Sequence, residues 1–356
     1  MRIEEAVELA PRTTLGVGGR ARYFAQAESE ADLVQALDWA STKGLSVRVL
    51  GGGSNLVVAD EGFDGLVLSI GLRGVTHVPA GNDVELRAAA GEPWDELVAS
   101  SVSQGLQGIE CLSGIPGLVG ATPIQNVGAY GQDVSESVVG VRALARRTRE
   151  FRQFSAEECR FRYRNSFFKS EAPGEFIVVS VSYRLRANAT PKVSYADLEK
   201  ALTHSGIEKP TLDDVRQAVL EVRRSKSMVL DAADENGRSC GSFFVNPIVS
   251  NSALPAIAER TGDAAMPRYP QNDGTTKLSA AWLIERAGFK KGTRDGKVGI
   301  STRHSLALVC HDGARTEDVV KLASRVRQAV FERFHVKLDP EPVFWGFPGD
   351  LPNDLS

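Results

Sequence analysis

Glycine-rich turns are the first segments of this sequence that could do chemistry. The segment GGGSN at residues 51–55 follows a run that reads as a strand. Successive backbone N–H groups on glycines can form a concave nest around a phosphate. Three glycines followed by Ser54 and Asn55 exceed what a plain hairpin turn requires, although such a turn stays the alternative. The segment therefore predicts a phosphate-binding turn.

Two common nucleotide-binding motifs do not fit this chain. The segment GVGGRA at 16–21 has the spacing G-x-G-x-x-A, but it precedes a strand-like run, whereas a dinucleotide-binding fold requires a helix there. The segment 51–55 is followed by another extended run and has no G-K-[ST] for a P-loop. A phosphate site here must therefore be of another kind.

A second glycine-rich segment, CLSGIPGLVGATPIQNVGAYGQD, covers residues 111–133. Its glycines and prolines exclude a long regular helix, yet its apolar side chains are too many for a free linker. A loop of this length inside a compact domain is usually functional. Together with 51–55 it suggests two glycine-rich surfaces that close on one extended ligand, such as a dinucleotide.

Helices and short strands must position these loops. Apolar residues recur at helical spacing in five segments, which are 29–43, 92–105, 212–226, 279–287 and 317–334. Strand-like runs occupy 46–50, 66–70, 84–90, 138–145, 176–186 and 305–309. This alternation favours an α/β or α+β protein.

Composition limits the class of protein further. The 356 residues carry 42 Lys plus Arg against 45 Asp plus Glu, a net charge of −3, which argues against a nucleic-acid binder. The four cysteines form no C-x-x-C pair, so we expect free thiols and a reducing compartment. No apolar run reaches the roughly 20 residues of a membrane helix, and the N-terminus lacks a signal-peptide core. We therefore expect a cytoplasmic protein without a membrane or nucleic-acid partner.

Several longer motifs resemble one known family. The sequence is similar to the UDP-N-acetylenolpyruvoylglucosamine reductase family, also called UDP-N-acetylmuramate dehydrogenases. The similar motifs occur in the family's order along nearly the whole chain, and they are RTTLGVGG, LGGGSNLVV, the segment 111–133, FRYRNSFFK (161–169), SCGSFFVNP (239–247), YPQNDGTTKLSAAWLIERAG (269–288) and LDPEPVFWG (338–346).

The resemblance implies an α+β fold. Its FAD-binding part would be the two-subdomain fold of the vanillyl-alcohol-oxidase (PCMH) type, joined by a third α+β domain for the substrate. We expect the first subdomain at 1–75, with 338–356 returning to it, the second at 76–228 and the substrate-binding domain at 229–337.

The resemblance also implies the contacts of FAD. The pyrophosphate would be held by the turn residues Gly52, Gly53, Ser54 and Asn55, with Leu56 beside them. The rest of the cofactor would be lined by residues of the long loop and one strand residue, namely Ile115, Gly117, Gly120, Gln125, Asn126, Gly128, Tyr130 and Ile177. Neither 51–56 nor 111–133 contains a histidine, so we expect FAD to be bound non-covalently.

The family activity implied is reduction of UDP-N-acetylglucosamine enolpyruvate to UDP-N-acetylmuramate, a step of peptidoglycan precursor synthesis. Hydride would pass from NADPH to FAD and then to the terminal enolpyruvyl carbon, leaving negative charge beside the carboxylate. That chemistry needs a cation at the carboxylate and a proton donor at the charged carbon. By family position, Arg164 would bind the carboxylate, Glu341 would lie near it and Ser242 would donate the proton.

Four residues correspond to substrate-binding positions of the family. Tyr195 resembles the tyrosine of the longer subtype, whose loop closes over the substrate, and Lys226 and Asn246 match positions for phosphate or sugar. Tyr163 adjoins Arg164. Val245 departs from relatives that have a lysine or another polar residue there, so a contact from this side chain is not expected. Sequence alone does not decide whether Glu341 is protonated.

Two other functions remain open at this point. An FAD-dependent sugar or alcohol oxidase of the same fold would explain the glycine loops. A flavin- or nucleotide-sugar-binding protein without catalysis would do so as well. Neither explains why competent residues fill all three catalytic positions. We expect no metal, and a monomer.

Overall fold

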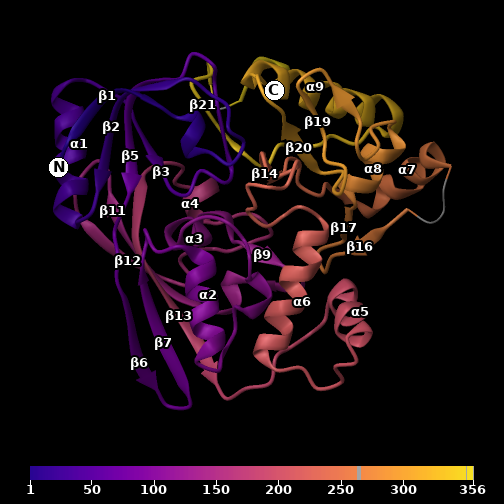
Figure 1. Ribbon diagram of the computed structural model, residues 1–356, viewed down its shortest axis with the longest axis horizontal. Coiled ribbons are helices and arrows are strands. Elements are labelled where there is room, and N and C mark those ends of the chain that lie inside the picture. The colour runs from indigo at the N-terminus through magenta and orange to yellow at the C-terminus, as the bar shows by residue number, and fades with distance from the viewer. Residues whose placement is uncertain (263–265, 350, 356) are drawn as a thin grey trace. The chain divides into compact units, whose positions relative to one another are not determined.

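The computed structural model describes residues 1–262, 266–349 and 351–355 (Figure 1). The chain forms two compact units. The first comprises Met1–Ala6, Arg22–Gly52 and Asp64–Leu230, and the second comprises Val7–Ala21, Gly53–Phe63 and Asp231–Ser356. The chain thus passes from one unit to the other inside the glycine turn, directly after Gly52. The division into three domains expected from the sequence stays a prediction.

The first unit contains two larger sheets. One has the strand order β1-β2-β5-β3, with β1 (Ile3–Glu8), β2 (Arg20–Ala27), β3 (Val47–Leu50) and β5 (Phe63–Ile70). The other has the order β12-β11-β13-β7-β6, with β6 (Val75–Ala80), β7 (Asp83–Ala89), β11 (Val138–Ala145), β12 (Phe151–Ser155) and β13 (Phe176–Ala187), and the short β8 (Leu106–Gln107) also pairs with β13. A two-stranded ribbon joins β9 (Gly128–Ala129) to β10 (Gln132–Asp133).

Helix α1 (Glu30–Thr42) shows how local sequence sets an element of this unit. The Ser29 side chain accepts a hydrogen bond from the Asp32 backbone N–H, and the Asp32 carboxylate accepts one from the Ser29 N–H, a capping box that fixes the first turn. The buried face consists of Leu33, Ala36, Leu37 and Ala40, the spacing of one helical stripe.

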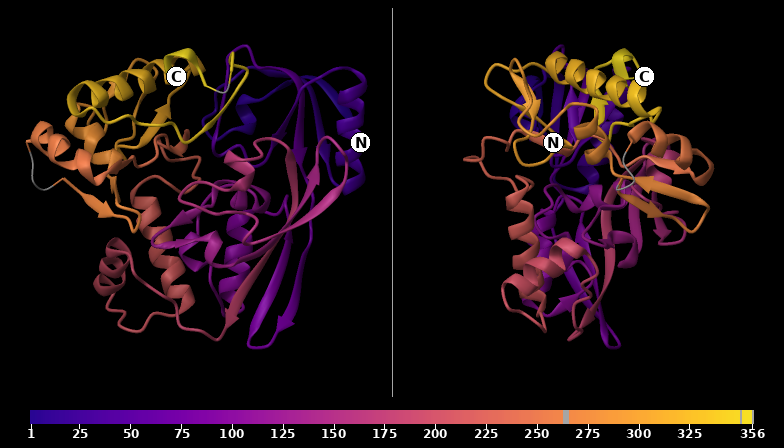
Figure 2. Two further views of the ribbon diagram at one scale, coloured as in Figure 1. Left: turned by 180° about the vertical axis from the view of Figure 1, so that it is seen from behind. Right: turned by 90° about the vertical axis from the view of Figure 1, so that its right-hand side faces the viewer.

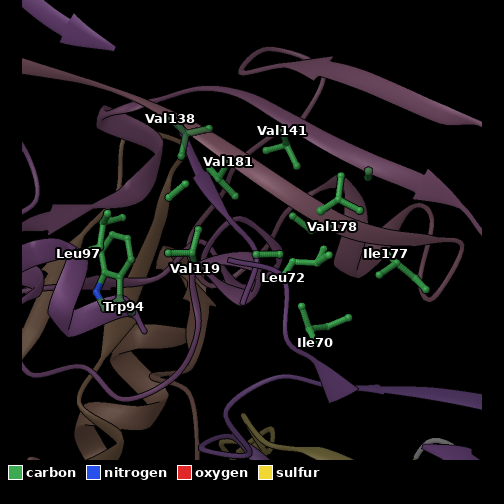
Figure 3. Packing of buried hydrophobic residues seen from close by; sticks show 14 of the residues in the cluster. Ile70, Leu72, Trp94, Leu97, Val119, Val138, Val141, Ile177, Val178 and Val181 are labelled. Atoms are coloured by element: carbon green, nitrogen blue, oxygen red, sulfur yellow. The ribbon is translucent and has the colours of Figure 1, made fainter. Parts of the chain in front are cut away.

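Helix α2 (Trp94–Ser103) packs into the core of the first unit. Figure 3 shows Trp94 and Leu97 of this helix beside Val119, with Val138 and Val181 of the sheet above them. Helix α6 (Leu212–Ser225) contacts α2, and α5 (Ala196–His204) contacts α6 (Figures 1 and 2). Two one-turn helices complete the unit, α3 (Thr122–Gln125) and α4 (Phe167–Ser170).

Over its described residues, the second unit combines small sheets with three helices. Its sheets have the orders β14-β20-β19-β18, β15-β17-β16 and β21-β4. Their strands are β4 (Leu56–Val58), β14 (Ser239–Ser242), β15 (Ile248–Ser250), β16 (Arg268–Pro270), β17 (Thr275–Leu278), β18 (Arg294–Asp295), β19 (Val298–Ile300), β20 (Ala307–Cys310) and β21 (Val343–Trp345). The helices are α7 (Leu254–Thr261), α8 (Ala280–Arg286) and α9 (Thr316–Phe334). Phe243, Phe244 and Phe334 are among the fully buried side chains of its core.

Short 3₁₀ turns link these elements at Ala10–Arg12, Glu110–Leu112, Val119–Ala121, Val134–Glu136, Asn251–Ala253 and Asn353–Leu355. All five predicted helices and all six predicted strands exist, with ends that differ by at most three residues. The loop expected at 111–133 is more structured than predicted, since it contains α3, β9 and β10. Helices and largely antiparallel sheets confirm the α+β alternative.

Candidate active site

The turn at 51–55 does not close a hairpin. The strand before it, β3, pairs in parallel with β5, whereas the strand after it, β4, pairs in parallel with β21. The two flanking strands therefore belong to different sheets, and the plain hairpin alternative is wrong. The glycines of this turn must serve another purpose.

Close approach of main chains explains two of these glycines. A Cβ added at Gly52 would lie 2.7 Å from the Gly117 Cα, and one added at Gly53 would lie 2.0 Å from the Arg12 carbonyl oxygen. Gly53 also has a φ of +65°, in the left-handed region that disfavours other residues. A Cβ at Gly51 would meet nothing within 4 Å. Positions 52 and 53 thus require glycine for reasons beyond the turn itself.

The substitution Gly52→Ala should lower both stability and FAD affinity. The added methyl group forces the turn away from Gly117, an overpacking that typically costs about 1–3 kcal/mol. Thermal denaturation and retention of flavin on dilution measure the two effects. Gly51→Ala is the matched control, because its Cβ enters open space, and it should change neither. Equal behaviour of the two variants would contradict this account.

The loop 111–133 is fastened to α2 by its backbone. The Trp94 backbone N–H donates to the Gly117 carbonyl at 3.0 Å, and the Trp94 indole Nε1 donates to the Leu112 carbonyl at 3.1 Å. The Gly114 N–H donates to the Asp95 carboxylate at 2.5 Å. An irregular loop held this way keeps a fixed shape, as a preformed binding surface requires.

Several expected FAD residues also have structural contacts. Asn126 is 3% exposed, its Nδ2 donates to the Arg162 carbonyl at 3.0 Å and its Oδ1 accepts from the Ser135 N–H at 3.3 Å. The Gln125 Oε1 accepts from the Lys169 Nζ at 2.8 Å. A Cβ at Gly120 would lie 2.6 Å from the Ala90 Cβ. These residues shape the loop, whatever they contact in FAD.

Two expected FAD residues lie in the hydrophobic cores. Ile177 of β13 is 2% exposed and packs in the core of the first unit, as Figure 3 shows. Leu56 of β4 is 5% exposed. Ile115 is half-buried and packs against the core. Apolar residues at Leu56 and Ile177 are therefore explained by packing alone.

Arg164 occupies a strained turn in the first unit. Arg162 and Asn165 exchange backbone hydrogen bonds of 3.0 Å, and Arg164 between them has a φ of +52°. Its Nη2 donates to the Gly128 carbonyl at 2.7 Å, and its guanidinium lies 5.4 Å from the Tyr163 ring centroid. Left-handed backbone in a residue other than glycine concentrates at functional sites. The turn orients the guanidinium toward the β9 end of the long loop.

Ser242 ends strand β14 in the second unit. The pairing of β14 with β20 is irregular between Ser239 and Ser242, and Gly241 there has a φ of +76°. The Ser242 Oγ lies 3.5 Å from the His304 Nε2. Cys240 is 4% exposed, and burial raises the pKa of its thiol, so it is poorly suited as a nucleophile. Ser242 is the better candidate for proton transfer.

Glu341 is brought beside Ser242 by the backbone. The Glu341 N–H donates to the carbonyl of Phe243 at 2.9 Å, the residue directly after Ser242. The Asn55 Nδ2 donates to the Glu341 carbonyl at 3.3 Å. The second unit thus brings Asn55 of the glycine turn close to Ser242 and Glu341. The two expected catalytic residues are about a hundred positions apart in the chain.

Aromatic and charged side chains gather near the end of α6. The Tyr130 and Tyr195 rings meet edge to face, with centroids 5.4 Å apart. The Lys226 Nζ donates to the Asp197 carboxylate at 2.9 Å and lies 6.0 Å from the Tyr130 centroid. Burial acts to lower the pKa of Lys226, but the bond to Asp197 and neighbouring groups raise it overall. Lys226 therefore keeps its positive charge beside two tyrosines. Tyr130 is expected to contact FAD, and Tyr195 is expected to contact the substrate.

Asn246 holds an element of the second unit. Its Oδ1 accepts from the Ala280 N–H at 2.9 Å, at the first residue of α8. The neighbouring Val245 N–H donates to the Asp339 carbonyl at 3.1 Å, beside the strand-like segment that leads to Glu341. A sugar or phosphate contact by Asn246 would therefore use its amide nitrogen.

Neither a metal-binding cluster nor a membrane-spanning helix occurs in the part of the chain that the structure describes. No group of three His, Cys, Asp or Glu residues there is placed to hold a metal ion. Over the same ranges, no helix is both long and apolar enough to cross a membrane. The four cysteines are buried and unpaired with one another.

One residue of this region was missed by sequence reasoning, His304. The signal for His304 was its place in a polar loop just before the strand predicted at 305–309. Arg223 belongs, with Arg224 and Lys226, to a basic cluster that the sequence matches either to a diphosphate or to a solvated helix end. The structure buries Arg223, so the solvated alternative does not hold for this side chain.

Comparisons with known proteins define first the class and then the family. Residues 21–149 match the family model described as FAD binding domain, which makes this an FAD-binding protein and confirms the expected FAD fold. Residues 232–345 match the model described as UDP-N-acetylenolpyruvoylglucosamine reductase, C-terminal domain. The chain belongs to the UDP-N-acetylenolpyruvoylglucosamine reductase family.

Relatives of similar length support this assignment. A UDP-N-acetylenolpyruvoylglucosamine reductase of Thermobifida fusca is 47% identical over 96% of this chain and 97% of its own. One of Saccharopolyspora erythraea is 48% identical over 94% and 93% of the two chains. The crystal structure of UDP-N-acetylenolpyruvylglucosamine reductase from Thermus caldophilus is 27% identical, with a TM-score of 0.67, and covers 97% of this chain and 99% of that chain. The family resemblance expected from the motifs is confirmed.

Proposed function

We propose that this protein reduces UDP-N-acetylglucosamine enolpyruvate to UDP-N-acetylmuramate in peptidoglycan precursor synthesis, with FAD as non-covalent cofactor and NADPH as reductant. The observation that carries the proposal is the convergence of Asn55, Ser242 and Glu341 in the second unit, in a chain of this family. The family assignment favours this reductase over the oxidase and the non-catalytic alternatives.

The residues present fit FAD. Glycine at 52 and 53 lets the turn lie directly against the main chain of Gly117 and Arg12, which fixes the place of the backbone N–H groups that would hold the pyrophosphate. The buried Arg223 Nε has no hydrogen-bond partner among the described residues, so the first unit offers an unmatched donor. The residues that would hold FAD are Gly52, Gly53, Ser54, Asn55 and Leu56 of the turn and Ile115, Gly117, Gly120, Gln125, Asn126, Gly128, Tyr130 and Ile177. When bound, FAD supplies the hydride relay from NADPH.

Arg164 and Glu341 would bind the substrate carboxylate and stabilise the charge that develops on it. Addition of hydride to the terminal enolpyruvyl carbon places negative charge on the neighbouring carbon and, by delocalisation, on the carboxylate. The planar Arg164 guanidinium would bind this carboxylate through two parallel hydrogen bonds. Glu341 near the same group would stabilise the enol form when protonated or orient the arginine when ionised.

Ser242 would supply the proton. A hydroxyl is a weak acid, but the carbon that accepts its proton is a strong base, so transfer is feasible when the Oγ is held in place. His304, 3.5 Å from that oxygen, is positioned to orient the hydroxyl. The new C–H bond takes the Ser242 proton, and solvent returns a proton to the serine oxygen afterwards.

The UDP part would be bound by Tyr163, Tyr195, Lys226 and Asn246. Lys226 keeps its charge beside Tyr130 and Tyr195, which suits a diphosphate flanked by aromatic rings. Tyr195 is 42% exposed and precedes α5 as its N-cap, a place from which a loop can cover a ligand. We also propose that the protein acts as a cytoplasmic monomer.

The test is to purify the protein, record a flavin spectrum and follow NADPH oxidation with and without UDP-N-acetylglucosamine enolpyruvate. We expect the visible absorbance spectrum of bound flavin, and NADPH consumption that depends on the substrate. Folded protein without flavin would overturn the proposal. Rapid reoxidation by oxygen, without substrate-dependent NADPH use, would favour the oxidase.

A further inference from the structure

Lys169 ends the motif FRYRNSFFK (161–169), of which the proposed function uses Tyr163 and Arg164. It belongs to the one-turn helix α4, and its side chain is half-buried. Its Nζ donates to the Gln125 Oε1 at 2.8 Å and to the Arg164 carbonyl at 3.0 Å. One ammonium group therefore joins an expected FAD residue to the backbone of the residue that would bind the substrate carboxylate.

The bond to the Arg164 carbonyl falls at a strained point of the chain. Arg164 has a φ of +52°, and its carbonyl lies outside the pair of backbone hydrogen bonds that Arg162 and Asn165 exchange. Left-handed backbone in a residue other than glycine is unfavourable, and it persists only where surrounding contacts hold it. The Lys169 Nζ provides such a contact, because it fixes the peptide group that follows Arg164.

Three further hydrogen bonds join the Arg164 turn to the long loop that would line FAD. They run from the Arg164 Nη2 to the Gly128 carbonyl at 2.7 Å, from the Asn126 Nδ2 to the Arg162 carbonyl at 3.0 Å and from the Ser166 Oγ to the Ile124 carbonyl at 2.8 Å. The helices beside this contact, α3 and α4, also touch (Figure 1). The turn and the loop are thus bonded along their length, and the Lys169 ammonium donates to both.

Aromatic packing holds the backbone of Lys169 in place. A helix of one turn is not stable by itself, so α4 depends on its neighbours. Phe168 is 5% exposed and meets the rings of Phe154 and Phe176 edge to face, with centroids 5.0 and 6.2 Å away. Phe167 packs on the same Phe154 ring at 5.6 Å. The Lys169 side chain therefore starts from a fixed base, as a residue that positions another requires.

We propose that Lys169 is a positioning residue for Arg164. By holding the Arg164 carbonyl and the Gln125 side chain with one ammonium, it sets where the guanidinium meets the substrate carboxylate relative to the loop that would line FAD. The inference rests on the proposed function, since it assigns a role within the same site. Lys169 acts through the backbone of Arg164 and needs no contact of its own with the substrate or with FAD.

The experiment is a double-mutant cycle between positions 164 and 169, measured on the holoenzyme at saturating NADPH and FAD. Lys169→Met removes both donated bonds and keeps an unbranched side chain, and it is made in the wild type and in Arg164→Met. Lys169→Arg keeps a charged donor and is the rescue variant. Ser170→Ala is the matched control, because it removes another side-chain bond of α4, from the Ser170 Oγ to the Ser166 carbonyl at 3.0 Å.

We expect Lys169→Met to lower kcat/KM for the enolpyruvyl substrate by about 10- to 100-fold, the loss expected for one charge-assisted hydrogen bond. In Arg164→Met the same change should alter kcat/KM by less than about twofold, because no guanidinium remains to be positioned. Lys169→Arg should recover part of the loss, and Ser170→Ala should stay within about twofold of the wild type. A role in stability alone would instead lower kcat/KM by the same factor in both backgrounds.

Wild-type kcat/KM in Lys169→Met, or an equal loss in both backgrounds, would overturn the inference. Weaker FAD retention with unchanged kcat/KM at saturating FAD would overturn it as well, because Lys169 would then serve only the loop through Gln125. If Lys169→Met does not fold, as thermal denaturation would reveal, Lys169→Gln takes its place in the cycle and the same outcomes decide. Wild-type protein that binds no flavin, or that oxidises no NADPH with the substrate, would instead refute the proposed function, so the two failures are distinguishable.

Discussion

Ser242→Ala should keep its flavin reducible by NADPH while reduction of the enolpyruvyl substrate falls by about 10²- to 10⁴-fold, the usual contribution of a positioned acid. The alanine removes only the hydroxyl, whose Oγ lies 3.5 Å from the His304 Nε2, at the end of β14. Stopped-flow absorbance separates the two half-reactions. The first should proceed at the wild-type rate and the second should stall.

A matched variant in the same strand gives the control. Ser239→Ala removes a buried hydroxyl three residues earlier in β14, at a position that pairs with Val309 of β20. It tests whether loss of any serine in this strand disturbs the site, and it should leave both half-reactions near the wild-type rate. Equal loss of both half-reactions in Ser242→Ala would contradict the role of proton donor.

The elements that sequence predicted well are those in which one local signal decides. Helix α1 begins where Ser29 and Asp32 form a capping box, and its buried stripe follows from spacing alone. The end of β3 and the start of β4 could be predicted because glycines separate the two apolar runs. Short strands such as β15 and β16 were missed, because two or three residues carry no periodic pattern.

The partners of the glycine turn could not be predicted from local sequence. Two extended runs around GGGSN read equally well as a hairpin, and only the pairing of β3 with β5 and of β4 with β21 excludes it. The decision rests on strands that are far apart in the chain. The same holds for Gly52, whose need for glycine arises from Gly117 in a separate segment.

The candidate site was predicted as residue identities and not as geometry. Motif resemblance provided Ser242 and Glu341, but their adjacency depends on a backbone hydrogen bond from Glu341 to Phe243 across the fold of the second unit. His304 had no motif role and became visible only through its contact with Ser242. A role that depends on a contact between distant residues cannot be predicted from the sequence around either of them.

Arg164→Met should lower kcat/KM for the enolpyruvyl substrate by about 10²- to 10⁴-fold. Two charge-assisted hydrogen bonds to a carboxylate contribute about 1.5–3 kcal/mol each, and every 1.4 kcal/mol corresponds to tenfold. Methionine has the same Cβ as arginine, so the strain of the +52° φ is retained and only the guanidinium is removed. Steady-state kinetics with saturating NADPH measure the effect.

Neighbouring substitutions separate charge from geometry. Arg164→Lys should recover only part of the loss, because an ammonium is a point charge without the planar fork. Arg162→Met, in the same turn, removes an exposed arginine whose ion pair with Glu171 spans 3.9 Å, and it should have little effect. Flavin reduction by NADPH should persist in all three variants. Since Arg164 also donates to the Gly128 carbonyl, a drop in FAD retention equal to the drop in kcat/KM would show that its main role is to hold the loop and not the substrate.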